Sequence, residues 1–420
     1  MARAEGFVRV SPDRTRLELP DGRPFYFAGA NCYYLLTRAA DPGLRHECTR
    51  VLDDAAAAGI TVLRLWAFAD GDEWNALQAA HNPPCLHPQL QPSPGRFDER
   101  VFRGLDWLVA EAAARGLRLL PVLTNYWQEY GGMRCYVRWA CAQRGQQPPT
   151  GEGEAAEPFY SDPDCQRMFH AALHALVHRT NSLTGRMDDP AILGWALANE
   201  PRCAGDTSCA RVALWAHHAA TFLKELDPHH LVTLDCEGFL GPSTPAACRA
   251  NPFDCAASGC DFASDCGSPA IDFACCHLYP DHWLPRAGEQ APIMSLQEQL
   301  RFALGWLDCH VELSRQLGKP LVLSEFGKRR GGWPGAAAAG RGDEQRAEYY
   351  RQVLGAALRH MRAGSGLAGW AFWMLAAPSY PDYDGFTVYF SGGPDGAGSG
   401  SSRTAGVIKE AAAAAPKQPP

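Results

Sequence analysis

Two glutamates stand at the ends of short apolar runs that are typical of buried strands. Glu200 follows the run at 192–198, and Glu325 follows the run at 321–324. Pro201 supports a strand end after Glu200, because proline has no N–H to give to a ladder. Two carboxylates that face one cleft from two strand ends are what hydrolysis of a glycosidic bond requires. We therefore treat Glu200 and Glu325 as the candidate catalytic pair.

The separation of the two carboxyl groups decides which reaction they can perform. At about 5 to 5.5 Å, one carboxylate can attack the anomeric carbon while the other protonates the leaving oxygen. The acid then needs a raised pKa and the nucleophile must stay ionised. Arg64, near the end of the apolar run at 61–66, is a cation that could keep one carboxylate charged. Taken singly, a glutamate after a strand is usually a solvated loop residue, and Arg64 could equally be a structural ion-pair partner.

The elements that must position these residues follow a repeating pattern. Strand-like runs occur at 25–30, 61–66, 118–123, 192–198, 231–234, 271–274, 321–324 and 367–373. Segments with helical spacing lie between most of them, at 47–58, 102–115, 163–179, 212–226, 296–317 and 344–362. Gly59 and Gly116 follow two of these helices, where a left-handed closing residue is expected.

Eight strands alternating with helices predict an α/β fold with a parallel sheet, and the repetition favours closure into a (β/α)8 TIM barrel. In such a barrel the active site lies at the carboxyl ends of the strands. The alternative is an open doubly wound sheet. Gly131-Gly132 follows a strand but lacks the glycine spacing of the phosphate turn of that fold.

The flanking segments complete the predicted organisation. Residues 7–18 are expected to form a small hairpin before the barrel. We expect one catalytic domain over residues 1–390, followed at 391–420 by a Gly/Ser/Ala/Pro-rich tail with room for one short helix.

Composition excludes several classes of partner. The formal charge is -7 and the pI near 6.1, so a polyanion such as nucleic acid is not expected. No apolar segment approaches the roughly 18 residues of a membrane span, and the first residues contain no apolar signal region. We expect a monomer that acts on a polysaccharide, away from membranes.

Sixteen cysteines point towards export. Seven of them lie between Cys236 and Cys276, which predicts a cysteine-rich loop insertion held by disulfides in a secreted, extracellular protein. The rival interpretation is a structural zinc site, because Cys275-Cys276-His277 offers soft ligands. The chain contains no CxxC pair, and the cysteine spacings fit no common zinc pattern well.

Aromatic residues accompany the polar ones at the predicted strand ends. Trp66, Trp127, Trp283 and Trp373 offer flat faces on which sugar rings can stack, although tryptophan is also a good core residue. We favour a substrate role for Trp127 and Trp373 and leave Trp66 and Trp283 open.

The chain resembles glycoside hydrolase family 5, and within it the endo-β-1,4-mannanases of the plant and fungal type. The resemblance covers about residues 7 to 390 and rests on a series of short motifs. These are LRLWAF at 63–68, NYWQEYGG at 125–132, NEPRC at 199–203, CEGF at 236–239, HLYP at 277–280, SEFGK at 324–328, FW at 372–373 and YDGF at 383–386. NEP and SEFG are shared across the family and beyond it, whereas the YGG, NEPRC, EGF and HLYP forms together point to mannanases.

The resemblance implies a role for each matching residue. Glu200 would be the general acid/base and Glu325 the nucleophile, held ionised by Arg64 and hydrogen-bonded by Tyr279. The remaining positions would bind substrate: Asn199 at the 2-hydroxyl, His277 beside Glu200, Trp373 under the distorted ring, Arg202 and Glu237 on the leaving-group side, and Trp127 as a platform further out. The family's chemistry needs no metal and no cofactor.

The implied activity is endo-acting, retaining hydrolysis of internal β-1,4-mannosidic bonds in mannans, galactomannans and glucomannans. The sequence departs from the mannanase pattern at Ala196, where a glutamate is usual, and at Cys32, where a small residue is common. The cysteine-rich segment also looks elaborated. A retaining cellulase or a mannan transglycosylase on the same fold stays open, as does a catalytically silent carbohydrate-binding barrel.

Overall fold

Eight parallel strands form the centre of the molecule. The computed structural model describes residues 6–78, 87–151, 153–253, 255–284, 294–330, 342–393 and 402–416. The strands are β3 (Phe27–Asn31), β4 (Val62–Trp66), β5 (Arg118–Val122), β6 (Gly194–Ala196), β7 (Leu231–Thr233), β8 (Ala274–Leu278), β9 (Leu321–Phe326) and β10 (Leu367–Phe372). They pair in the order β7-β6-β5-β4-β3-β10-β9-β8.

Backbone contacts join the two ends of this sheet. The Asp272 N–H donates to the Val232 carbonyl at 2.8 Å, and the His277 N–H donates to the Glu237 carbonyl at 3.0 Å. The sheet therefore closes into a barrel, and the predicted (β/α)8 fold is confirmed.

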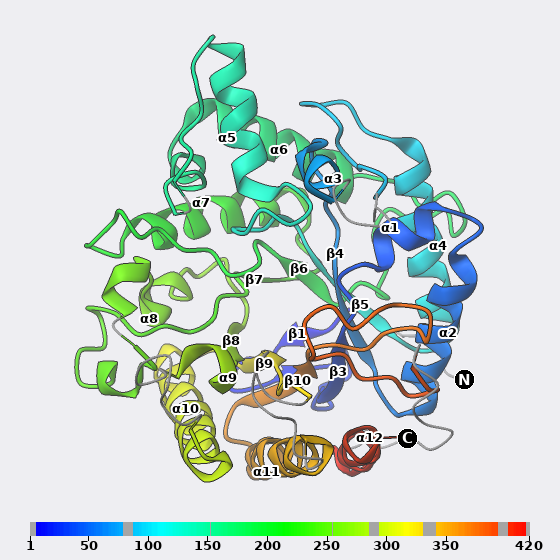
Figure 1. The fold of residues 1–420 in the computed structure, drawn as a ribbon, viewed down its shortest axis with the longest axis vertical. Coiled ribbons are helices and arrows are strands. Elements are labelled where there is room, and N and C mark those ends of the chain that lie inside the picture. Colours follow the sequence, from blue (N-terminus) through cyan, green and yellow to red (C-terminus); the bar gives the residue numbers. More distant parts are fainter. Residues whose placement is uncertain are drawn as a thin grey trace.

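Helices surround the barrel (Figure 1). The outer ring contains α2 (Arg45–Ala57), α4 (Glu99–Ala114), α6 (Pro163–Val177), α7 (Arg211–Leu226), α10 (Leu296–Leu317), α11 (Gly342–Ala363) and α12 (Arg403–Ala414). Shorter helices are α1 (Leu35–Ala40), α3 (Glu73–Gln78), α5 (Gly132–Gln143), α8 (Phe262–Asp265) and α9 (Pro280–Trp283). Three 3-10 turns lie at Glu157–Tyr160, Cys248–Ala250 and Cys255–Ser258.

Local sequence fixes where these helices begin and end. Ser295 and Glu298 form a capping box at the start of α10, and Gly318 closes that helix with a φ of 64°. Gly59 and Gly116 also adopt the expected left-handed conformation, with φ of 79° and 71°.

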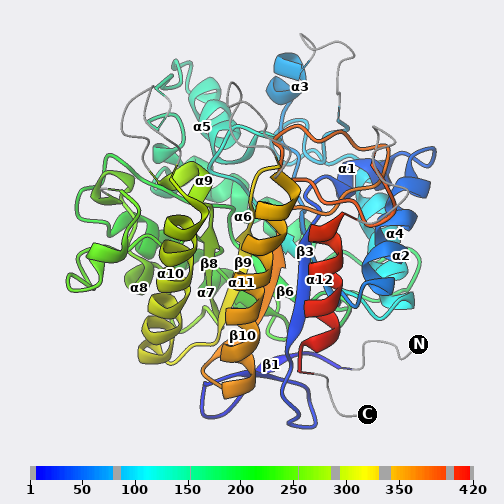
Figure 2. The same ribbon diagram turned by 60° about the horizontal axis from the view of Figure 1, so that its bottom comes forward.

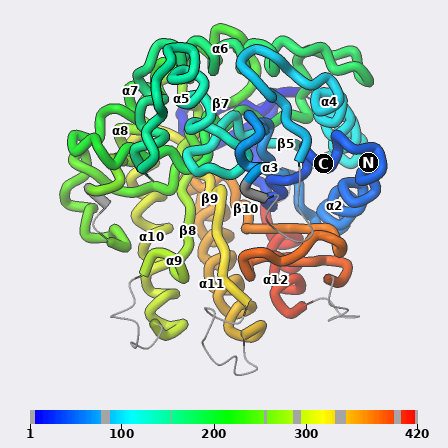
Figure 3. The backbone as a smooth tube through the Cα atoms, turned by 45° about the horizontal axis from the view of Figure 1, so that its top comes forward, coloured from blue at the N-terminus to red at the C-terminus, as the bar shows by residue number. Residues whose placement is uncertain are grey.

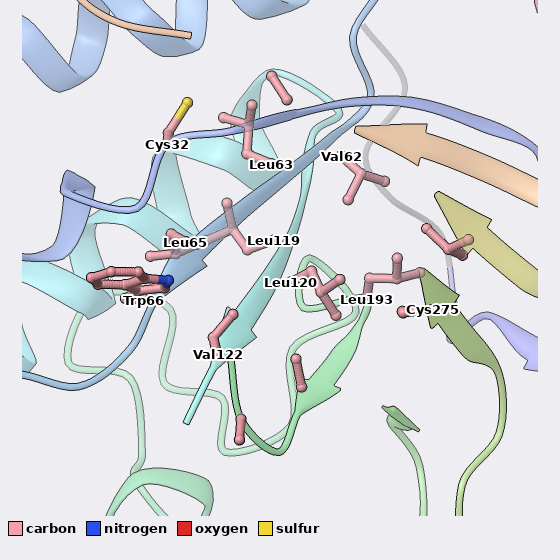
Figure 4. Packing of buried hydrophobic residues seen from close by; sticks show 14 of the residues in the cluster. Cys32, Val62, Leu63, Leu65, Trp66, Leu119, Leu120, Val122, Leu193 and Cys275 are labelled. Carbon is pink, nitrogen blue, oxygen red and sulfur yellow. The ribbon is translucent and has the colours of Figure 1, made fainter. Parts of the chain in front are cut away.

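The core lies inside the barrel and between it and the helices. Leu63 and Leu65 on β4 pack near Leu119 and Leu120 on β5, and all four are at most 2% exposed (Figure 4). Strands buried on both faces are mostly apolar, which is why the runs do not alternate regularly with polar residues. Arg64 in β4 and Glu325 in β9 are exceptions, and both belong to the site described below.

The N-terminal hairpin covers the lower end of the barrel. It pairs β1 (Arg9–Val10) with β2 (Leu17–Glu18) in antiparallel register, as predicted. Figure 2 places it at the end of the strands opposite α3. Leu17 is fully buried there, and Arg118 at the start of β5 donates to the Gly6 carbonyl at 3.1 Å.

The C-terminal tail supplies the last helix of the barrel. Figures 2 and 3 show α12 beside α11, and Val407 and Ile408 are buried in that contact region. Because α12 follows β10 and packs on the barrel, we propose that the catalytic domain extends to Ala414 and not to residue 390. Residues 394–401 and 417–420 of the predicted tail lie outside the described residues.

The structure differs from the disulfide prediction. Every cysteine whose side chain is described is a free thiol, including six of the seven between Cys236 and Cys276. Cys255 lies outside the described side chains. Cys275 and Cys276 belong to β8 and are fully buried, so they pack as small core residues. The prediction of a disulfide-held loop is therefore wrong for these six residues.

The structure also gives no helix that is long and apolar enough to cross a bilayer, within the residues that it describes.

Candidate active site

A cavity of about 860 Å³ opens at the carboxyl ends of the barrel strands. Its wall combines the following side chains: Tyr33, Trp66, Trp74, His87, Trp127, Glu129, Tyr130, Asn199, Glu200, Arg202, Glu237, Phe253, Tyr279, His282, Trp283, Glu325, Trp373, Tyr380, Tyr383, Asp384 and Phe386. An apolar, aromatic wall with a few convergent polar groups is typical of a ligand site.

Glu200 and Glu325 meet in this cavity. Glu200 lies after β6 with a φ of 49°, and its N–H donates to the Asp235 carbonyl at 3.2 Å. Glu325 lies within β9, one residue before its end. A carboxylate oxygen of each glutamate and a ring nitrogen of His277 all lie within 4.8 Å of one another. This close approach favours a retaining pair over an inverting pair, whose carboxyl groups stand further apart.

Glu325 is held by a cation and a hydroxyl. Arg64 Nη1 lies 2.6 Å from Oε1 of Glu325, and the Tyr279 hydroxyl donates to Oε2 at 2.6 Å. Arg64 is itself 1% exposed and donates to Asn31 at 2.8 Å and to Asn199 at 2.5 Å. These contacts fix the orientation of the carboxylate and favour its charged form.

Glu200 is held by two ring nitrogens. Nδ1 of His277 lies 2.7 Å from Oε1, and the Trp127 indole donates to Oε2 at 2.7 Å. Both carboxylate oxygens therefore have a partner before any substrate is present.

A third carboxylate, Asp235, supports the pair from behind. It follows β7, is fully buried and has a φ of 68°. Its Oδ2 accepts from Arg64 Nε at 2.5 Å, and its Oδ1 accepts from the Ser324 hydroxyl at 2.7 Å. Nε2 of His277 lies 3.4 Å from the same Oδ1.

The charges in this cluster shift one another. Burial acts to lower the pKa of His277, but the carboxylates of Glu325, Asp235 and Glu200 outweigh it and raise the pKa to about 10. Burial acts to raise the pKa of Asp235, but Arg64, His277 and Ser324 bring it well below its usual range. At neutral pH the imidazole therefore carries a proton and Asp235 does not.

The two glutamates shift in opposite directions. Burial acts to raise the pKa of Glu200, but the hydrogen bond and charge of His277, together with Arg202 and Trp127, bring it below its ordinary value. Burial raises the pKa of Glu325, although His277 and Arg64 oppose the rise. This order is the reverse of the one predicted for an acid at Glu200 and a nucleophile at Glu325. The reason is that His277 places its positive charge closest to Glu200.

Arg202, which is partly exposed, and the buried Glu237 form an ion pair beside Glu200. Two guanidinium nitrogens donate to the two Glu237 oxygens, at 2.7 and 2.5 Å. The guanidinium carbon lies 4.9 Å from the ring centre of Trp127 and 5.1 Å from that of Phe239. Burial and the charge of Glu200 raise the pKa of Glu237 to about 7 in spite of Arg202.

Trp373 forms an aromatic floor with Tyr33. The two rings are parallel within 3°, and their centres lie 5.3 Å apart. The Trp373 indole donates to Asp384 at 2.9 Å, which fixes the ring.

The loop that carries Trp127 depends on two glycines. Gly131 and Gly132 have φ of 94° and 58°, and a Cβ on Gly131 would lie 2.0 Å from the Asp70 carbonyl oxygen. No other residue fits that approach without moving the backbone.

The structure brings together all ten residues that the sequence predicted for the site. Eight of them lie on the cavity wall, whereas Arg64 and His277 lie behind it and are at most 1% exposed. The resemblance implied that His277 binds substrate beside Glu200, but in the structure His277 is fully buried and contacts Glu200 from the core. Trp66 and Trp283, which the sequence left open, are also on the wall.

Sequence reasoning missed Asp235 and Tyr33. Asp235 directly follows the strand-like run at 231–234, and Tyr33 lies two residues after β3, so the strand-end signal that identified Glu200 was present for both.

Among the described residues, the ligand atoms of Glu200, His277 and Glu325 lie close enough together to hold a metal ion. The same atoms already contact Trp127, Tyr279 and one another. Arg64 and the protonated His277 supply the positive charge that a metal would bring, so we assign no metal to this group.

Comparison with known proteins decides the family. The family described as GH family 5 beta-mannosidase-like matches residues 5–386. The chain belongs to this family. Glu200 and Glu325, whose close approach favours a retaining mechanism, thus lie in a chain of glycoside hydrolase family 5.

Similar proteins include plant and bacterial enzymes. A putative mannan endo-1,4-beta-mannosidase 5 of Oryza sativa subsp. japonica is 39% identical to this family 5 chain, over 87% of the chain and 70% of the relative. Mannan endo-1,4-beta-mannosidase 2 of Arabidopsis thaliana is 37% identical, over 86% and 78%. An endo-beta-1,4-mannanase structure from Thermotoga petrophila matches with a TM-score of 0.73 and 28% identity, over 94% of this chain and 77% of that one.

Proposed function

We propose that this protein is a mannan endo-1,4-β-mannosidase that cleaves internal β-1,4-mannosidic bonds with retention. The observation that carries the proposal is the separation of at most 4.8 Å between carboxylate oxygens of Glu200 and Glu325 in an aromatic cavity. The names of the plant and bacterial relatives support the choice of mannan as the substrate.

In the first half-reaction Glu325 attacks the anomeric carbon, and Glu200 gives a proton to the leaving oxygen. Arg64 and Tyr279 stabilise Glu325 as a carboxylate until it attacks. In the second half-reaction Glu200 takes a proton from water, which attacks the glycosyl-enzyme and releases Glu325.

The other predicted residues orient the polysaccharide. Trp373 and Trp127 present ring faces to the sugars. The hydrogen bond from Arg64 to Asn199 fixes the Asn199 side chain, which contacts the 2-hydroxyl of the sugar. Arg202 and Glu237 form a rigid polar wall on the leaving-group side.

The proposal includes a monomeric enzyme that is exported to the polysaccharide. Size-exclusion chromatography of the purified protein tests the first part, and fractionation of producing cells from their medium tests the second.

The decisive test is release of reducing sugar from linear mannan, galactomannan, glucomannan and cellulose, measured side by side. We expect release from the three mannans and little from cellulose. Glu325→Ala should lower turnover by at least roughly 10⁴-fold while the folded protein still binds mannan, because it removes the nucleophile. Glu312→Ala, on the exposed face of α10, is the matched control and should behave as wild type.

Each other result has a definite meaning. Cleavage of cellulose alone would assign a cellulase on the same catalytic pair. Longer products without net release of reducing ends would assign a transglycosylase. Binding without any reaction, or normal turnover by Glu325→Ala, would contradict the proposed reaction.

A further inference from the structure

The pKa order of the two glutamates needs an explanation, because the proposed acid, Glu200, is the one whose pKa is lowered. The cause is the contact between Glu200 Oε1 and Nδ1 of His277 at 2.7 Å. A proton between these two atoms gives an ion pair if it resides on nitrogen and a neutral pair if it resides on oxygen. Both forms carry the same net charge, so the acid proton is stored in the pair.

This storage works only if the other ring nitrogen of His277 keeps its own proton. A neutral imidazole has one N–H and one bare nitrogen, and Nδ1 can accept from a protonated Glu200 only when Nε2 holds the hydrogen. The acceptor that faces Nε2 is Oδ1 of Asp235, at 3.4 Å.

Asp235 can act only as an acceptor. Arg64 donates to its Oδ2, and the Ser324 hydroxyl donates to its Oδ1, both of which favour the ionised carboxylate. An ionised carboxylate has no hydrogen to give, so the hydrogen between Asp235 and His277 must belong to Nε2.

We propose that Asp235 is a positioning residue that keeps a proton on Nε2 of His277, so that Nδ1 shares the acid proton with Glu200. This inference rests on the proposed function. In the first half-reaction the shared proton passes from Glu200 to the leaving oxygen as the C–O bond breaks and Glu325 bonds to the anomeric carbon. In the second, Glu200 recovers a proton from the attacking water, and the bond to Glu325 breaks.

The test replaces Asp235 by asparagine. The amide oxygen of Asp235→Asn can still accept from Arg64, while its NH2 group faces Ser324 and Nε2 of His277. The NH2 group of this asparagine favours the His277 tautomer with a bare Nε2 and a proton on Nδ1. The Nδ1–H group then donates to Glu200 and keeps the Glu200 carboxylate ionised. Acid catalysis should fail although the nucleophile is intact.

Two substrates separate acid failure from general damage. Cleavage of a manno-oligosaccharide requires protonation of the leaving oxygen. Cleavage of 2,4-dinitrophenyl β-mannobioside does not, because 2,4-dinitrophenolate leaves as a stable anion. We expect Asp235→Asn to lower kcat/KM by about 100-fold or more for the oligosaccharide and by less than about 10-fold for the aryl substrate. Equal losses on both substrates would overturn the proposal.

The pH profile gives a second readout. The charged or titratable groups around Asp235 and His277 are Arg64, Glu200, Glu237, Cys275, Tyr279 and Glu325. Replacing Asp235 removes one negative charge that stabilises the protonated pair, so the basic limb of kcat/KM should move down by about one pH unit or more. An unchanged basic limb would contradict the proposal.

Asp227→Asn is the matched control. Asp227 precedes β7 at the opposite end of the barrel, is buried, and accepts from His230 at 2.6 Å and Trp195 at 2.8 Å. It should lose stability without changing the ratio between the two substrates. Asp235→Gly is a second test variant, because its φ of 68° suits glycine, and it should show the same preference for the aryl substrate.

The outcomes stay separate from those of the proposed function. Wild-type protein that cleaves no mannan would contradict the proposed function itself. Active wild type with equal losses in Asp235→Asn would contradict only the role of Asp235.

Discussion

Charge compensation between individual side chains organises the mouth of the barrel. Three carboxylates, Glu200, Asp235 and Glu325, share one guanidinium and one imidazolium within contact distance. Removing either cation would leave buried negative charge without a partner, which costs several kcal/mol. The same side chains thus hold the site together and set its proton distribution.

A buried carboxyl away from the catalytic pair should control the pH dependence of stability. Burial raises the pKa of Asp70 to about 7, although the Gln91 amide donates a hydrogen bond to this carboxyl at 3.2 Å. The folded state then holds a proton on Asp70 up to about pH 7, whereas the unfolded chain releases it near pH 4. Stability from this group is full below about pH 4 and is lost as the pH rises to 7.

Asp70→Asn should remove that loss, because an amide stays neutral at every pH. We expect the free energy of unfolding at pH 8 to rise by about 1 to 3 kcal/mol, with little change at pH 4. Denaturant titrations of both proteins at the two pH values measure the effect. An identical pH dependence in wild type and variant would show that Asp70 is already ionised in the folded protein.

The sequence predicted the two glutamates that meet in the cavity because each stands at the end of a short apolar run. It could not identify the protonation order, since that depends on His277 of β8, which contacts Glu200, and on Asp235 after β7, which contacts His277. Contacts between strands far apart in the chain leave no trace in local spacing.

At the scale of elements, apolar runs predicted all eight barrel strands, but not all of their limits. The run predicted at 271–274 overlaps β8 only at Ala274, because β8 spans Ala274–Leu278. The prediction stopped too early, since Cys275-Cys276-His277 continues the strand. Cysteines behaved there as core residues and not as disulfide partners. The helix α5 was missed because it begins at Gly132, the second residue of the glycine pair in the loop that carries Trp127.

The element whose contribution is easiest to test is α12. Ile408 of α12 is fully buried, α12 packs on α11, and Arg362 of α11 donates to the Ala414 carbonyl at 2.9 Å. Ile408→Ala should lower the free energy of unfolding by about 2 to 4 kcal/mol through cavity formation. Denaturant unfolding measures it, and Glu410→Ala, exposed on the same helix, is the control. Equal stabilities of the two variants would mean that α12 does not belong to the folded domain.

At the scale of the whole molecule, the lining of the cavity is extensive enough to bind several sugar rings. The stacked rings of Tyr33 and Trp373 line one part of the cavity, and Arg202 and Phe253 line another part. Phe253 comes from the cysteine-rich segment, packs edge-on to Phe239 at 5.1 Å and is 40% exposed. The elaborated loop therefore contributes directly to the binding wall.

This arrangement predicts that activity grows with substrate length and that Phe253 contributes only for longer chains. Phe253→Ala should lower kcat/KM by about 3- to 10-fold for mannopentaose or longer substrates, because it removes one aromatic contact with a sugar ring. We expect mannotriose to be too short to reach Phe253, so it should react equally with variant and wild type. Leu214→Ala, on the outer helix α7 with 58% exposure, is the control and should change neither value. Equal losses for short and long substrates would instead place Phe253 in the support of Arg202 and Glu200, and the cysteine-rich segment would then act on catalysis and not on chain length.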